Sequence, residues 1–133
     1  MNEDARAFLD KARQSMAGAE REYTSGAYDN SANRCYYAAY QAAISILLEL
    51  QITTPSKIGD MKHQPVRAMF ATEVIRRRKL LRSDFSSSLD ALASIRKSAD
   101  YLPAPVGKTK ARKARDLARL LVDAVVAFLE KRP

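Results

Sequence analysis

The sequence predicts an all-α domain, an up-and-down bundle of four to five helices. The chain has 133 residues, of which 22 are alanine, 4 glycine and 5 proline, and 47% of it is hydrophobic. Apolar residues recur every three or four positions, whereas the alternation typical of strands is absent. A chain of this length is expected to form one domain, residues 1–133, with a buried core.

The first helix is expected over residues 3–23, because Leu9 and Ala12 belong to a stripe that steps by three and four. Asn2 can cap its start. The second helix is expected over residues 28–50. It has the broadest apolar face, and its alanines allow neighbouring helices to approach closely, so we expect it to be the central helix.

Pro55 and the two threonines before it are expected to end the central helix, and residues 56–64 to form a loop. A third helix is predicted over residues 65–78, since a proline is tolerated in a first turn. The basic run 76–79 suits the C-terminal end of that helix.

The fourth helix is predicted over residues 84–101, because Phe85 opens an apolar stripe and prolines follow the segment. The fifth is predicted over residues 108–131. It should bury an apolar stripe that includes Leu120 and Leu121, while its first half presents basic residues.

The charge is unevenly distributed along the chain. Residues 1–56 carry 5 Lys/Arg and 7 Asp/Glu, a net of −2, and residues 57–133 carry 18 and 8, a net of +10. This asymmetry favours a polyanionic partner, with nucleic acid first and an acidic protein second. The alternative is a basic but otherwise ordinary solvated surface.

Several classes of protein are excluded by composition. A single cysteine, Cys35, cannot form an internal disulfide, and the single histidine excludes multi-histidine zinc sites. No glycine-rich phosphate loop is present. From these absences together we expect no metal and no cofactor. The longest uncharged run, 35–48, is too short for a membrane span, and residues 1–10 lack the apolar core of a signal peptide; a cytoplasmic location is expected.

Two segments combine aromatic and polar residues. In the first, Asn33, Arg34 and Tyr37 can line a cleft against another helix, although tyrosines in such a run are also common in cores. In the second, Arg96 and Asp100 are four residues apart and can pair on one helix face. Such a pair can hold an arginine ready for phosphate, or it can be a weak surface ion pair.

Two further residues are candidates for chemistry. Tyr101 lies about 140° around the helix from Arg96, and it can share a pocket with that arginine if the last turn unwinds. His63, near a helix start, can bind a ligand or move a proton near neutral pH, or can be structural.

In this order, these segments resemble the HEPN domain family, in its stand-alone bacterial and archaeal branch. The resemblance rests on Arg34 followed by Tyr36-Tyr37-Ala38, on Lys62-His63, and on residues 96–101, Arg-Lys-Ser-Ala-Asp-Tyr. It implies a helical bundle that forms a homodimer. It also implies either metal-independent cleavage of RNA, often by toxins of toxin–antitoxin or defence systems, or a non-catalytic role. In the non-catalytic role, the domain works beside a minimal nucleotidyltransferase or binds nucleotides.

The sequence departs from the family at the nuclease motif. The family motif is Arg-x(4–6)-His, but Tyr101 follows Arg96 after four residues. Histidine titrates near neutral pH and tyrosine does not, so the chain lacks the usual acid–base group, unless His63 replaces it. Arg96, Tyr101 and His63 are therefore the candidate catalytic residues, and Asn33, Arg34, Tyr37 and Asp100 the candidate residues for binding RNA or a nucleotide.

Three functions remain open from the sequence. The first is a protein that binds RNA or a nucleotide at a dimer cleft, with a nucleotidyltransferase as its partner. The second is a metal-independent ribonuclease toxin. The third is a non-catalytic interaction module whose apolar helix faces form the interface, in which case replacing Arg96 changes only stability.

Overall fold

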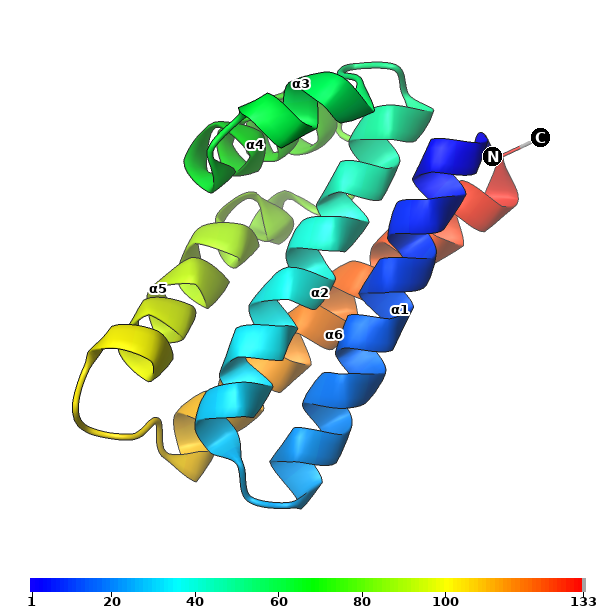
Figure 1. Cartoon of the computed structure of the whole chain (residues 1–133). Helices are drawn as coiled ribbons and strands as arrows, with labels where there is room; N and C mark the ends of the chain where they lie inside the picture. Colours follow the sequence, from blue (N-terminus) through cyan, green and yellow to red (C-terminus); the bar gives the residue numbers. More distant parts are fainter. Residues whose placement is uncertain (133) are drawn as a thin grey trace.

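The computed structural model of the chain describes residues 1–132 and confirms the all-α prediction. Four long helices form the bundle, with α2 beside α1 and against α5 and α6 (Figure 1). Their bounds are α1 Glu3–Thr24, α2 Tyr28–Glu49, α5 Ser88–Tyr101 and α6 Lys108–Lys131. The short elements between α2 and α5 are α3 Pro55–Asp60, α4 His63–Met69, the π-helix η1 Phe70–Arg77 and the 3₁₀-helix η2 Ser83–Ser87.

The central position of α2 follows from its composition. Fourteen of its 22 residues are buried, and most of these are alanine, serine, leucine or isoleucine. Alanine and serine are small, so α1 and α6 can pack close to its backbone. The prediction that residues 28–50 form the central helix is confirmed, with the helix ending at Glu49.

Two buried serines fix the register of α1 against α2. The hydroxyl of Ser31 donates a hydrogen bond to the carbonyl of Ala19 at 2.9 Å, and that of Ser45 donates to the carbonyl of Ala5 at 2.8 Å. Ser31 and Ser45 are 14 residues apart on α2, and Ala5 and Ala19 are 14 residues apart on α1. This separation is about 21 Å along an α-helix. The two bonds therefore hold the antiparallel helices together at well-separated levels.

The start of α1 forms as predicted. Asn2 is the N-cap, and its side-chain oxygen accepts a hydrogen bond from the backbone N–H of Ala5 at 2.8 Å. The Asn2 amide group in turn donates to the carbonyl of Leu48 at the far end of α2. A single residue thus starts one helix and joins it to the next.

The prediction that residues 56–64 form a loop is partly wrong, because these residues include most of α3 and the start of α4. Pro55 begins α3 instead of only ending α2, since proline suits a first turn and the Thr54 side chain caps it. α3 buries Ile58. α4 begins at His63, two residues before the predicted start.

The third and fourth predicted helices also differ in detail. Residues 70–77 have π-helical rather than α-helical geometry, and the bond from the Arg78 N–H to the Glu73 carbonyl has the wider i→i+5 spacing. The fourth helix begins with a 3₁₀ turn, η2, before α5. On α6, Leu120 is 50% exposed instead of buried, because Leu121, Val122 and Val125 face the core.

The lone cysteine is a core residue. Cys35 on α2 is fully buried, as expected for a small apolar filler. Burial raises the pKa of its thiol to about 11.

We predict that Ser31→Ala and Ser45→Ala each lower the free energy of unfolding by about 0.5–1.5 kcal/mol, because each removes one interhelical hydrogen bond. Ser98→Ala is the control, since its hydroxyl bonds within its own helix, and it should change stability by less than about 0.5 kcal/mol. Urea unfolding followed by circular dichroism measures all three. Equal losses in the three variants would show that the serine bonds do not hold the helix pair.

Candidate functional site

A group of polar and aromatic side chains surrounds Tyr36 on α2. Its side chain is fully buried, and its hydroxyl lies 3.0 Å from His63 Nδ1 and 3.1 Å from Arg67 Nη1. Side chains from α2, α4 and α5 meet here, and we call this group the Tyr36 cluster. Its members are Tyr36, Tyr37, Tyr40, His63, Arg67 and Arg96.

The Tyr36 hydroxyl joins Arg67 to His63. Arginine can only donate, so the Tyr36 oxygen accepts from Arg67, and the hydroxyl and His63 Nδ1 share one further hydrogen bond in which either can be the donor. This bond occupies Nδ1 and leaves Nε2 as the other ring nitrogen. The imidazole also stacks on the Tyr40 ring, with centroids 4.3 Å apart.

Burial affects the protonation of this cluster. It raises the pKa of Tyr36, and it raises the pKa of Tyr40 to about 12, so both phenols are neutral. The pKa of His63 is lowered, mainly by burial and further by the charges of Arg96 and Arg67. His63 is therefore neutral at physiological pH.

Arg96 on α5 extends the cluster toward the surface. Its guanidinium lies over the Tyr36 and Tyr37 rings, 5.0 and 5.6 Å from their centroids, and its Nη1 donates to the Tyr37 hydroxyl at 3.2 Å. Asp100 lies 3.7 Å from the same nitrogen. Within residues 1–132 the buried Nε has no hydrogen-bond partner, so most of the five N–H donors of Arg96 are not used by the protein.

Both arginines of the cluster are anchored by carboxylates. Arg67 Nε donates to Asp90 on α5 at 3.0 Å, while Asp100 also accepts from the Asn33 side chain at 3.1 Å. Acidic residues thus hold each guanidinium beside the aromatic rings. Such anchoring restricts the rotamers of an arginine before any ligand binds.

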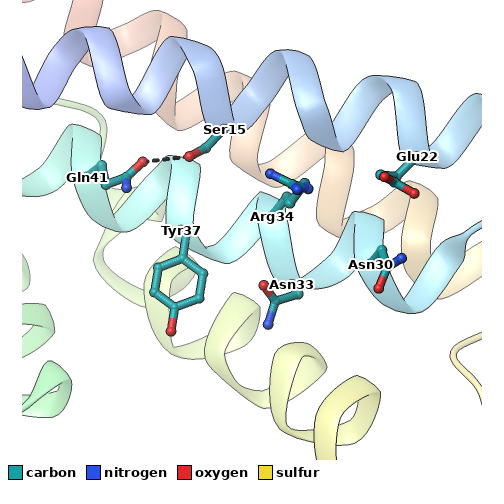
Figure 2. Close-up of a pocket in the computed structure, with 7 residues that line it drawn as sticks. All are labelled: Ser15, Glu22, Asn30, Asn33, Arg34, Tyr37 and Gln41. Carbon is teal, nitrogen blue, oxygen red and sulfur yellow. Dashed lines mark hydrogen bonds between the residues drawn. The ribbon is translucent and has the colours of Figure 1, made fainter.

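A polar groove between α1 and α2 borders this cluster. Figure 2 shows Arg34 between the two helices, whereas Asn33 and Tyr37 point toward α5. Ser15 and Gln41 are joined by a 2.7 Å hydrogen bond at one end. The groove has a volume of about 410 Å³, and it is lined by Ser15, Glu22, Asn30, Asn33, Arg34, Tyr37 and Gln41.

Gly18 makes room for Arg34 in this groove. A Cβ atom added to Gly18 would lie 3.1 Å from Arg34 Cδ and 3.3 Å from its Nη1, so the arginine crosses α1 where no side chain intervenes. Among the described residues Arg34 forms no ion pair. Arg34 is an exposed residue, so an anion can approach it.

The structure brings five of the seven predicted site residues into one network: Asn33, Tyr37, His63, Arg96 and Asp100. His63 and Arg96, which the sequence alone could not place relative to each other, both contact Tyr36.

Two predicted residues lie outside this network. Tyr101 is 73% exposed at the end of α5, because that helix continues to its last residue and its final turn does not unwind. Arg34 faces α1, in the groove, and Tyr37 and Asn33 are the residues that connect the groove with the cluster.

Four residues of the site are not predicted from the sequence. Tyr36 and Tyr40 are expected only to pack in the core, and no role is expected for Arg67 or Asp90. The spacing of Arg67, four residues after His63, was a usable signal, because it places both on one helix face. Nothing in the sequence connects Asp90 to Arg67, since they are 23 residues apart.

Residues 1–132 contain no group of three or more His, Cys, Asp or Glu side chains that could hold a metal ion. No helix in that part of the chain is both long and apolar enough to cross a membrane.

Fold and site together define an all-helical domain with a half-buried arginine among tyrosines. The sequence matches the HEPN domain family over residues 5–131, which is nearly the whole chain. The chain therefore belongs to the HEPN family, and the resemblance inferred from its motifs is confirmed. A comparison with curated proteins returned no match.

We predict that the free energy of unfolding decreases as the pH falls below about 6.5. Unfolded His63 then binds a proton that folded His63, with its lowered pKa, does not. The decrease stops once the pH is below the folded pKa. Urea unfolding between about pH 7.5 and 5 should show this component in the wild type and not in His63→Gln. Parallel pH profiles for the two proteins would contradict it.

Proposed function

We propose that this HEPN domain binds RNA or a nucleotide at a cleft formed by two copies of the chain. Membership of the family indicates an RNA-related or nucleotide-binding helical protein, and HEPN domains commonly dimerise and bind RNA. The proposal assigns the contact to the surface that holds Arg96, Tyr37 and Asn33. The α1–α2 groove extends this surface to Arg34.

The state of Arg96 is the observation that supports this function most strongly. The guanidinium is held by Asp100 and by two tyrosine rings, yet most of its donors have no acceptor within residues 1–132. A phosphate accepts two parallel hydrogen bonds from one arginine. Because the side chain is already positioned, little conformational entropy is lost when a phosphate binds.

The neighbouring residues suit the rest of such a ligand. Tyr37 is half-buried and offers a hydroxyl and a ring edge, and Asn33 offers an amide for hydrogen bonding. The Nε2 atom of neutral His63 adds one group that can donate or accept a hydrogen bond. Residues 57–133, with their net charge of +10, would attract a polyanion over longer distances.

The partner that the family resemblance implies is part of the same proposal. A homodimer would combine two Arg96 surfaces, and a minimal nucleotidyltransferase encoded with this protein would act as antitoxin or as the catalytic half of a pair. Support for these finer assignments comes only from the resemblance.

We predict that Arg96→Gln weakens binding of a fluorescently labelled RNA about tenfold, which corresponds to about 1.4 kcal/mol. Arg115→Gln is a matched control, since Arg115 also lies over a tyrosine ring and beside an aspartate. Each variant removes one positive charge from the basic half. Fluorescence anisotropy at low and high salt measures both affinities. Equal weakening in the two variants would show that the effect comes only from the loss of one positive charge. Absence of salt-dependent binding by the wild type would refute nucleic-acid binding.

A metal-independent ribonuclease is the second candidate, because His63 and Arg96 both contact Tyr36. The lowered pKa of His63 weighs against it. Little imidazolium is then present near neutral pH to protonate the leaving oxygen, as a general acid must. The site therefore favours binding over cleavage.

Cleavage of total cellular RNA in the presence of a chelator distinguishes the two functions. We expect no cleavage by the wild type, or by Arg96→Ala and His63→Gln. Cleavage by the wild type that is lost in both variants would identify a nuclease that uses this pair. Cleavage that survives both substitutions would indicate a contaminating nuclease.

A further inference from the structure

An apolar hollow lies between α6 and the segment that joins η1 to η2. It has a volume of about 400 Å³, and we call it the Leu120 hollow after its most exposed apolar residue. Leu120 is 50% exposed although the pattern of its helix predicts burial. The lining residues are Leu80, Leu81, Arg82, Phe85, Leu120 and Ala124.

The hollow is bordered along the chain by a strongly basic segment. Residues 76–82 contain five basic residues and no acidic one. Arg77 pairs with Glu73 and Arg82 pairs with Asp84. Within the described part of the chain, the remaining three form no ion pair and are exposed: Arg76, Arg78 and Lys79.

We propose that the Leu120 hollow binds an amphipathic acidic segment of a partner protein. Leucine or phenylalanine side chains of that segment would enter the hollow, and its Asp and Glu side chains would face Arg76, Arg78 and Lys79. Apolar contacts would supply affinity, and complementary charge would supply orientation and selectivity. The hollow involves α6 and the η1–η2 segment, not the Tyr36 cluster, so the proposal does not depend on RNA binding.

Charge and burial disfavour nucleic acid or a second copy of the chain as the occupant of the hollow. Nucleic acid gains little from a leucine-lined surface, and the one aromatic ring of the hollow, Phe85, is 5% exposed and covered by the Arg82 guanidinium at 4.9 Å. A second copy of the chain placed with its own hollow here would bring two basic segments together, and like charges at an interface are unfavourable.

Selection from a random peptide library displayed on phage tests the proposal without a known partner. Purified wild-type protein is the target, and Leu120→Glu is the counter-target, because an exposed position tolerates the change without loss of the core. Leu102→Glu is the matched control, since Leu102 is 59% exposed but lies between α5 and α6. We expect enriched peptides that combine Asp or Glu with Leu or Phe at helical spacing.

The affinity of an enriched peptide, measured by fluorescence anisotropy, should fall about tenfold for Leu120→Glu and remain within about twofold for Leu102→Glu. Enrichment of peptides without acidic residues, equal binding to all three proteins, or no enrichment at all would overturn the proposal.

Two further results would assign the hollow to another occupant and so also overturn the proposal. One is displacement of the peptide by a short RNA whose own binding is reduced by Leu120→Glu. The other is self-association of the wild type, seen by sedimentation velocity, that Leu120→Glu abolishes.

Discussion

The burial of α2 is the constraint on which the rest of the molecule depends. A helix enclosed by neighbours cannot hydrate its polar side chains, so each of them needs a partner within the protein. Ser31 and Ser45 find theirs on α1, and this sets the register of the first helix pair. Tyr36 finds its partners on α4, and Arg96 of α5 lies over its ring. The same requirement that orders the bundle therefore assembles the candidate site.

The helical periodicity of the sequence was sufficient to predict the long helices, because each has one continuous apolar face and a recognisable end. It was insufficient between residues 51 and 88. There Pro55 begins a helix where it was expected only to end one, and a π-helix replaces the α-helical register after Met69. Such choices depend on which residues tertiary packing buries, and Ile58 and Phe70 are buried only because other elements cover them.

The site was predicted where its members are close in sequence, as in the Arg96–Asp100 pair. It was missed where they are distant, as in the contact between Arg67 and Asp90. The spacing of residues along the sequence also does not show which neighbouring helix each side chain faces. Arg34 and Tyr37 are three positions apart, yet they face different neighbouring helices (Figure 2). The motif that suggested one cleft therefore describes a cluster and an adjoining groove that share Tyr37.

The buried thiol of the central helix has a practical consequence. With a pKa of about 11, Cys35 holds only about one thiolate in a thousand near pH 8, and no reagent can reach it while α2 is enclosed. Its reaction with a thiol reagent must therefore wait until the neighbouring helices separate from α2. Since the chain has a single cysteine, the rate at which Cys35 reacts with a thiol reagent reports one event, the opening of the bundle around α2.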